Sequence, residues 1–102
     1  MHYVICYDLE SDRLRGKVAK ALQKHGCNRV QKSVFVAADM SAKHLERLSS
    51  ALKKLLASGT AAAQDSVLVI PLPEEYARLS MAFGGLNSIL AETQPLPSKI
   101  LL

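Results

Sequence analysis

The amino-acid sequence predicts a two-layer α/β sandwich in which a β-sheet carries both helices on one face. Three short apolar runs typical of strands alternate with two longer segments of helical periodicity: the runs occupy residues 2–7, 28–39 and 67–70, and the helical segments 12–25 and 42–58. Elements of these lengths in this order enclose one hydrophobic core between two layers. The length of 102 residues is that of one domain. The natural solution is a ferredoxin-like βαββαβ fold.

The first apolar run, HYVICY, is expected to form a strand that is buried on both faces and ends at Asp8. A helix is expected to follow it over residues 12–25. Ser11 and Asp12 offer side-chain oxygens that cap a helix N-terminus, and Gly26 is typical of the residue that ends a helix. The chain therefore turns from sheet to helix directly after Asp8.

Residues 28–39 return to β character, either as one long bulged strand or as a short hairpin, and the sequence leaves both open. Ser41 is expected to cap a second helix over 42–58, because leucines recur there at helical spacing. Gly59 is expected to end this helix. The small and polar residues of 59–66 predict a flexible connection to the next strand.

The apolar run at 67–70 predicts a third strand, which Pro71 and Pro73 close. Beyond this strand the pattern supports two structures. One is a helix that begins at Pro73, with two acidic residues near the positive end of its dipole. The other is an edge strand over residues 76–83.

We expect residues 1–72 to form the core of a single domain, 1–102, and residues 73–102 to form a C-terminal extension. The extension ends in an apolar segment, Ile100-Leu101-Leu102, that needs a partner surface. Both helices are expected on one face of the sheet, and a chain of this length has no third layer for the other face. A homodimer packed sheet to sheet is the expected cover.

Several classes of protein and site are excluded by what the sequence lacks. No apolar run approaches the roughly 20 residues that a membrane span needs, and the first residues show no basic leader or cleavage site. Cys6, expected in the core, and Cys27, expected as a free thiol, match neither a disulfide scaffold nor a zinc knuckle. The histidines lack zinc-site spacing. We expect a cytoplasmic protein without a membrane partner.

Positive charge is concentrated in one fifth of the chain. The net charge is +4, and the segment from residue 13 to 32 holds no Asp or Glu and seven cations: Arg13, Arg15, Lys17, Lys20, Lys24, Arg29 and Lys32. Four of them recur at helical intervals that place them in a sector of roughly 60° on the predicted helix: Arg13, Lys17, Lys20 and Lys24. Solvated helix faces normally mix both signs, and like charges this close repel one another.

A polyanion would offset that repulsion, so the basic segment predicts nucleic-acid binding. Aromatic residues that could stack on bases make up only 5% of the chain. We therefore expect contact with a duplex or with the phosphate backbone rather than the reading of single-stranded bases.

Asp8 is the strongest candidate for a catalytic residue. Functional groups of open α/β sheets gather beyond the carboxyl ends of strands, although an Asp at that place also serves as a turn residue that bonds its own backbone. Arg15 lies in the first turn of the predicted helix, close to Asp8. Mg²⁺ is typically held by one or two carboxylates, with water and phosphate oxygens completing its shell. Two Asp8 side chains that meet across a two-fold axis would form a shared Mg²⁺ site.

Three motifs follow one another along the chain: Tyr7-Asp8-Leu9, RLRGKVAK at 13–20 and GCNRVQKSVF at 26–35. Together with Ser41 and the VLVIPL strand, they closely resemble the CRISPR-associated protein 2 family over residues 2–72. Members of that family are small dimeric partners of the CRISPR integrase in spacer acquisition.

The resemblance implies a ferredoxin-like homodimer whose C-terminal strand packs on the partner subunit's sheet. It also implies assembly with integrase dimers around a duplex prespacer DNA. Several family members are described as Mg²⁺-dependent endonucleases on single-stranded RNA or double-stranded DNA. By position, Asp8 matches the family's metal-associated aspartate, Arg15 and Arg29 match its functional arginines, and Phe35 matches its strand aromatic. Lys17 stands where many members have a second arginine. Lysine keeps the positive charge but cannot bind a phosphate through two parallel hydrogen bonds, as arginine does.

Two functions of different classes follow. In the first, the chain is a structural, nucleic-acid-binding subunit that bridges integrase dimers, and its basic residues neutralise phosphates. In the second, it is a metal-dependent phosphodiesterase in which the Asp8 pair holds Mg²⁺ while Arg15 and Arg29 stabilise the transition state. We favour the first, with cleavage as a secondary activity. The alternatives are an RNA-cleaving toxin and a small ferredoxin-like regulatory module. The regulatory module would need a glycine-rich ligand loop, and Gly84-Gly85 is the only candidate in the sequence.

Overall fold

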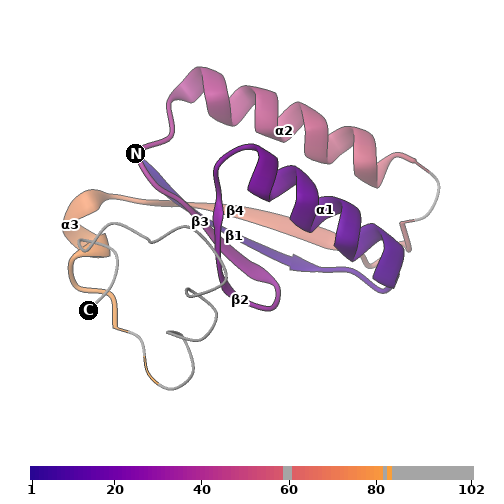
Figure 1. Cartoon of the computed structure of the whole chain (residues 1–102), viewed down its shortest axis with the longest axis horizontal. Coiled ribbons are helices and arrows are strands. Elements are labelled where there is room, and N and C mark those ends of the chain that lie inside the picture. The colour runs from indigo at the N-terminus through magenta and orange to yellow at the C-terminus, as the bar shows by residue number, and fades with distance from the viewer. Residues whose placement is uncertain (59–60, 82, 84–102) are drawn as a thin grey trace.

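The computed structural model describes residues 1–58, 61–81 and 83, which form a sheet covered on one face by two helices (Figure 1). In chain order the elements are β1 (His2–Asp8), α1 (Asp12–Lys24), β2 (Asn28–Gln31), β3 (Val34–Ala37), α2 (Ala42–Leu56), β4 (Ser66–Leu72) and α3 (Glu74–Ala77). The strands pair antiparallel in the order β2-β3-β1-β4. The predicted two-layer α/β sandwich with ferredoxin-like βαββαβ order is confirmed, while its packing into a homodimer stays a prediction.

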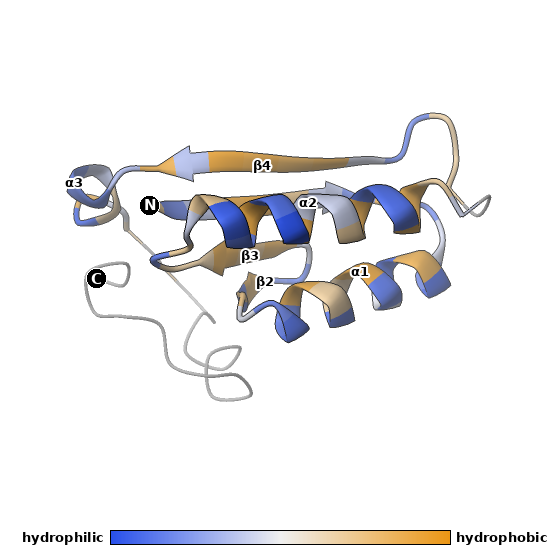
Figure 2. Ribbon diagram, turned by 90° about the horizontal axis from the view of Figure 1, so that it is seen from above, coloured by the Kyte–Doolittle hydropathy of each residue, from blue (hydrophilic) through white to orange (hydrophobic). Residues whose placement is uncertain are grey.

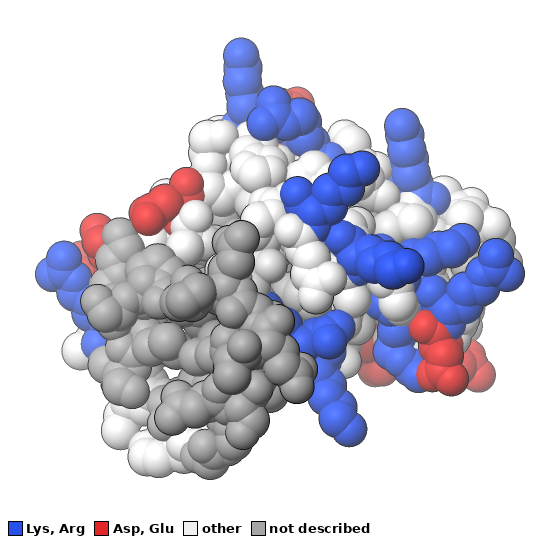
Figure 3. Space-filling view, in the orientation of Figure 1, with Lys and Arg blue, Asp and Glu red and all other residues white. Residues whose placement is uncertain are grey.

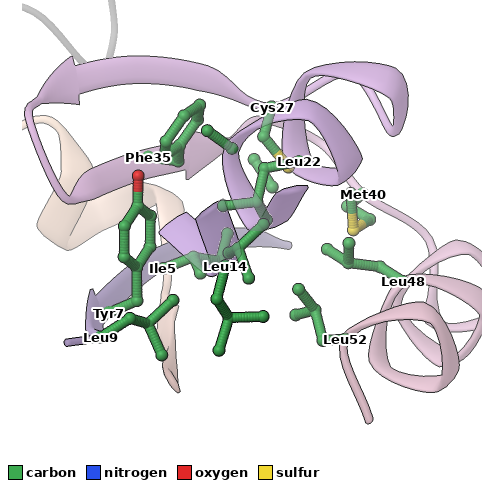
Figure 4. Packing of buried hydrophobic residues seen from close by; sticks show 13 residues of the cluster. Ile5, Tyr7, Leu9, Leu14, Leu22, Cys27, Phe35, Met40, Leu48 and Leu52 are labelled. Carbon is green, nitrogen blue, oxygen red and sulfur yellow. The ribbon is translucent and has the colours of Figure 1, made fainter. Parts of the chain in front are cut away.

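The hydrophobic core lies between the sheet and the layer formed by α1 and α2. Along both helices polar and apolar residues alternate, as a helix with one buried face requires (Figure 2). Side chains from both layers interdigitate and are fully buried, among them Ile5, Leu14, Val18, Leu22, Phe35 and Leu48 (Figure 4). Each buried leucine contributes about 1.5–3 kcal/mol, so the core fixes the end of β1 against the start of α1.

The ends of α1 follow from the residues that the sequence analysis singled out. The Ser11 side chain accepts a hydrogen bond from the Leu14 N–H at 3.2 Å, which confirms Ser11 as the N-terminal cap. Gly26 has a φ of 82°, and its N–H donates to the Gln23 carbonyl at 3.0 Å. Only glycine adopts this left-handed conformation without strain, so Gly26 ends the helix as expected. The last helical residue is Lys24, one residue earlier than predicted.

The segment 28–39, which the sequence left open, is a hairpin of β2 and β3 with a register shift between Arg29 and Gln31. Strand β4 differs from expectation, because it continues through Pro71 to Leu72 instead of closing at Ile70. β4 lies at the edge of the sheet and pairs only with β1 among the described strands. Pro71 is tolerated there because its missing N–H can face the open edge.

The two faces of the sheet differ in burial. On the helix side, Ile5 and Tyr7 of β1 are buried. On the opposite side, Cys6 is only half-buried and Leu68 and Ile70 of β4 are 58% and 46% exposed. The expectations that β1 is buried on both faces and that Cys6 lies in the core are therefore wrong for the single chain, because nothing described covers this part of the sheet.

Short helix α3 covers one end of that second face, where Ala77 packs with Val36. Of the two structures proposed after Pro73, the helix is confirmed and the edge strand is wrong for the described residues. Residues 84–102, which include Gly84-Gly85 and the apolar end of the extension, lie outside the described residues. In the part of the chain that is described, no helix has the length and apolar character to cross a bilayer.

Candidate functional site

The end of β1, the start of α1 and the β2–β3 hairpin surround a cavity of about 590 Å³. Four charged residues line it: Asp8, Arg15, Arg29 and Lys32. The structure therefore brings the predicted aspartate together with both arginines that the resemblance marked, although they come from three separate elements. One carboxylate among three cations makes the cavity net positive, as a site for a phosphate group would be.

Asp8 is the last residue of β1 and lies opposite Ser66 of β4. Its side chain is exposed toward the cavity rim. Within the described residues, the Asp8 carboxylate makes no hydrogen bond or ion pair, so the turn role that the sequence also allowed is not seen. The strand delivers this carboxylate to the cavity with its oxygens open to a ligand.

Arg15 lies beside Asp8, as the helical projection predicted, but its guanidinium is occupied by the loop between β1 and α1. Nη1 donates to the carbonyls of Leu9 at 2.7 Å and Glu10 at 3.1 Å, and Nη2 forms an ion pair with Asp12. These contacts hold the loop that follows Asp8. Sequence reasoning missed this role, because helical periodicity says nothing about the path of the preceding loop.

Asp65 fixes the same loop from the other side and was also missed. Its carboxylate accepts hydrogen bonds from the Glu10 N–H at 3.0 Å and the Ala62 N–H at 2.8 Å. The described end of the segment expected to be flexible, residues 61–65, is thus a turn anchored to the rim of the cavity. An Asp after small residues signals a local turn, but no sequence pattern reveals a partner 55 positions away.

Arg29 lies over the ring of Phe35, with its guanidinium carbon 5.1 Å from the ring centroid. Phe35 is fully buried and stacks on Tyr7 at 6.2 Å between centroids. The Tyr7 hydroxyl donates to the Lys32 carbonyl at 3.2 Å and holds the hairpin in place. Phe35 therefore supports Arg29 from the core and presents no surface for stacking a base.

The Arg29 Nε is buried and has no hydrogen-bond partner within the described residues. A buried charged donor without a partner is costly, and native structures normally satisfy such groups. A phosphate oxygen is the acceptor that an arginine at the edge of a positive cavity binds best. The Nε is therefore an unsatisfied donor in a residue that lines the cavity.

The donor set of one chain fits Mg²⁺ only in part. The described residues contain no group of three or more His, Cys, Asp or Glu side chains placed to hold a metal ion. Asp8 is the one carboxylate that lines the cavity. Since Mg²⁺ is held by one or two carboxylates plus water and substrate phosphates, Asp8 fits as one ligand, and a second Asp8 or a phosphate would complete the set.

The other predicted nucleic-acid ligands do not line the cavity. Four cations form a stripe on the outer face of α1, here called the α1 stripe: Arg13, Lys17, Lys20 and Lys24. All four are exposed, and none forms an ion pair with a described residue. Figure 3 shows Lys and Arg side chains gathered over the part of the surface where the two helices lie. The arrangement predicted from spacing is present, and no described acidic residue neutralises it.

Cys27 and His25 follow α1 on the side away from the cavity. Cys27 is a free thiol, as expected, and burial raises its pKa to about 11, which makes it a poor nucleophile. The pKa of His25 is lowered by partial burial and, to a smaller degree, by the positive surroundings of His44, Arg47 and Lys24. Neither residue has the surroundings of a catalytic group.

Comparison with known proteins places these features in a family context. The family model described as CRISPR associated protein Cas2 matches residues 1–78. A CRISPR-associated endoribonuclease Cas2 from Aeropyrum pernix is 33% identical over 85 residues, which cover 83% of this chain and 87% of that protein.

Two further relatives match over shorter segments. The CRISPR-associated endoribonuclease Cas2 2 of Pyrobaculum aerophilum is 50% identical over 36 residues, 35% of this chain and 40% of that protein. The CRISPR-associated endoribonuclease Cas2 1 of Methanospirillum hungatei is 36% identical over 53 residues, 52% of this chain and 55% of that protein. The chain thus spans about half the length of these two relatives and most of the Aeropyrum protein.

Proposed function

This chain belongs to the CRISPR-associated protein Cas2 family, and on that premise we propose that it is a nucleic-acid-binding subunit of CRISPR spacer acquisition that bridges integrase dimers. The observation that carries the proposal is the α1 stripe. Four exposed cations repeat on one face of a helix, and none is paired with a described acid. Such a face is stabilised by a polyanion and lacks the mixed charges of an ordinary solvated face.

The dimensions of the α1 stripe suit a sugar–phosphate backbone. Eleven residues separate its first and last members, which corresponds to about 16 Å of helix. One strand of a B-form duplex carries about five phosphates over that length, since successive phosphates rise by about 3.4 Å. The stripe makes no demand on base sequence, as expected of a subunit that accepts prespacers of many sequences.

A homodimer would double this surface. The exposed side chains of Leu68 and Ile70 on the open face of the sheet support packing of two subunits through that face. Two copies of α1 would then lie on the outside of the dimer, related by a two-fold axis. A duplex prespacer that crosses both copies would join the surfaces at which integrase dimers bind.

Metal-dependent cleavage of RNA or DNA is a second activity of the same protein in this proposal. It is favoured by the cavity, which gathers Asp8, Arg15, Arg29 and Lys32, and by the endoribonuclease names of the relatives. Asp8 and its counterpart in the dimer would hold Mg²⁺, which polarises a phosphoryl oxygen and lowers the pKa of bound water.

The chain's own cations have separate tasks in that reaction. Arg29 lines the cavity, where its positive charge would stabilise the negative charge of a phosphate oxygen. Arg15 holds the loop after Asp8 and so keeps the carboxylate in place. Single-stranded RNA and duplex DNA both present the phosphodiester that this arrangement binds.

Co-purification with the cognate integrase and prespacer DNA tests the proposal. The Lys17→Glu/Lys20→Glu/Lys24→Glu protein should fail to assemble, whereas Asp8→Ala should assemble normally and lose Mg²⁺-dependent cleavage. Assembly by the charge-reversed protein would contradict the binding role. Cleavage by Asp8→Ala at the wild-type rate would contradict the nuclease role and leave the binding role standing.

A further inference from the structure

Helix α2 carries a second row of exposed residues with the spacing of the first, and three of its four members are cations. Lys43, Arg47, Ser50 and Lys54 follow one another at intervals of four, three and four residues, as Arg13, Lys17, Lys20 and Lys24 do on α1. The three cations of this row are exposed and form no ion pair with a described residue. They line a shallow depression of about 650 Å³ together with Ser50, Ala51 and Glu46. We call Lys43, Arg47 and Lys54 the α2 stripe.

The α2 stripe lies on the outer face of α2, on the half that is nearer to α1. At about 100° per residue, it lies on the outer face of α2, shifted by roughly 30° toward His44. His44 marks the side of α2 that meets α1, since its ring lies 5.3 Å from that of His25. Glu46, the only acidic residue of α2, falls on the opposite side of the stripe.

The α1 stripe lies on the outer face of α1, on the half that is nearer to α2. It lies on the outer face of α1, shifted by a similar angle toward His25 and α2. The two helices pack against each other and run antiparallel, so that the end of α1 lies beside the start of α2 (Figure 1). Burial lowers the pKa of His25 most, and Arg47 of α2 and Lys24 of α1 lower it further, so cations from both helices lie near this ring.

The outer surface of the two helices thus carries two neighbouring rows of cations along their length. Packed helices lie about 8–10 Å apart, a separation that seven unpaired positive charges tolerate better when an anion lies between the two rows. A single extended phosphate backbone provides negative charge at regular intervals along both rows. An acidic protein surface offers no such regular spacing, so the backbone is the occupant that the pattern favours.

We propose that one strand of the bound nucleic acid lies over the outer surface of α1 and α2, between the two stripes, with Lys43, Arg47 and Lys54 contacting its phosphates from the α2 side. This inference rests on the proposed nucleic-acid-binding function and adds a second set of ligands to it. The α2 stripe extends the footprint of each protomer beyond the α1 stripe and fixes the direction of the strand parallel to the helices.

Single charge-neutralising substitutions in the full-length protein test the α2 stripe. Lys54→Gln is compared with Lys53→Gln. The second substitution removes the same charge from the preceding residue of the helix, whose side chain lies about 100° around the helix axis and outside the stripe. The readout is fluorescence anisotropy of a labelled DNA duplex over a range of salt concentrations. Each lost phosphate contact lowers the salt slope by about 0.9 and weakens binding up to about eightfold at 0.1 M salt.

We expect Lys54→Gln and Arg47→Gln to show that loss and Lys53→Gln to bind within twofold of wild type. Equal, small effects at all three positions overturn the inference. If these variants bind normally while Lys17→Gln/Lys20→Gln/Lys24→Gln does not, the α2 stripe is wrong and the proposed function survives. If the α1 variant also binds like wild type, the proposed function itself fails. Weakened binding to the integrase alone would assign the stripe to a protein partner and also overturn the inference.

The His25 side chain provides a second readout beside the two stripes. Burial is the main cause of its lowered pKa and nearby cations lower it further, so we expect phosphates placed between the stripes to raise it. Titration of the His25 ring by NMR, with and without saturating duplex, should show an upward shift in the bound state. An unchanged pKa in a protein that binds duplex would place the strand elsewhere and contradict the inference.

Discussion

The cavity at the end of β1 and the outer face of the helices both carry positive charge, but the cations of the cavity are held by other groups and those of the helices are not. In the cavity, Arg15 is held by two carbonyls and Asp12, and Arg29 is held over Phe35. On the helices, the α1 stripe stands in solvent without a described ion-pair partner. Fixed cations suit recognition of one phosphate in a set geometry, whereas mobile cations suit a long backbone of variable sequence. Under the proposed function, the helices would therefore supply affinity and the cavity would supply the chemistry.

The largest expected effect is a loss of duplex affinity when lysines of the α1 stripe are replaced and the cavity is left unchanged. Lys17→Gln/Lys20→Gln/Lys24→Gln removes three phosphate contacts, which should weaken duplex binding by up to about 500-fold at 0.1 M salt. Fluorescence anisotropy measures the affinity, and Lys53→Gln serves as the control for removal of charge from a helix. Because all three lysines are exposed and repel one another, the thermal stability of the variant should equal or slightly exceed that of wild type. Unchanged binding would assign the affinity to the cavity.

A smaller effect is expected from a substitution near the cavity, which should lower stability and leave duplex affinity unchanged. Asp65→Ala removes the carboxylate that accepts from the Glu10 and Ala62 N–H groups, and should lower the free energy of unfolding by about 2 kcal/mol. No cation of the helices contacts Asp65, so duplex affinity should stay within twofold. Urea denaturation measures the change, with Gln64→Ala as the neighbouring control, since among the described residues the Gln64 side chain makes one exposed hydrogen bond, to Glu10 at 3.5 Å. Equal losses for both variants would contradict the role of Asp65.

A third comparison concerns how firmly the cavity cations are held. The contact between Arg29 and Phe35 should be worth about 0.5–1 kcal/mol. A double-mutant cycle of Arg29→Met and Phe35→Leu, followed by urea denaturation, isolates this coupling from the packing change at Phe35. Additive effects of the two substitutions would show that the ring does not position the guanidinium.

The smallest expected effect is a pH dependence at the helix face. The pKa of His25 lies below 6.5 in the folded protein, because burial and nearby cations disfavour its charged form. The unfolded chain therefore binds more protons in this range, and stability should fall as the pH drops through and below 6.5. Thermal unfolding across that range should show a weaker fall for His25→Gln than for wild type. An equal fall in both proteins would exclude His25 as the cause.

The sequence predicted those features that depend on neighbouring residues. Ser11 and Gly26 define the ends of α1 through local hydrogen bonds and backbone conformation, and the α1 stripe follows from helical spacing alone. The position of Asp8 at the cavity follows from the strand that precedes it. The fold could also be predicted from the order of the elements, because alternating strands and helices can be connected in few ways.

Features that depend on tertiary contacts were beyond the sequence. Pro71 was expected to close β4, because its place at the sheet edge depends on the order of the strands. The link from Asp65 to Glu10 joins loops that only the folded sheet brings together. The α2 stripe is visible in the sequence once sought, but Glu46 and the leucines of α2 interrupt it, and its orientation toward α1 needs the packing of both helices.

The central claim, that exposed cations on the helices bind the phosphate backbone independently of the cavity, is tested most directly by the salt dependence of duplex binding. Wild type and Asp8→Ala should share one slope of log affinity against log salt, at least as steep as about −3.6 if the four cations of the α1 stripe each contact a phosphate. A slope near zero for wild type, or a slope that collapses in Asp8→Ala, would contradict the account.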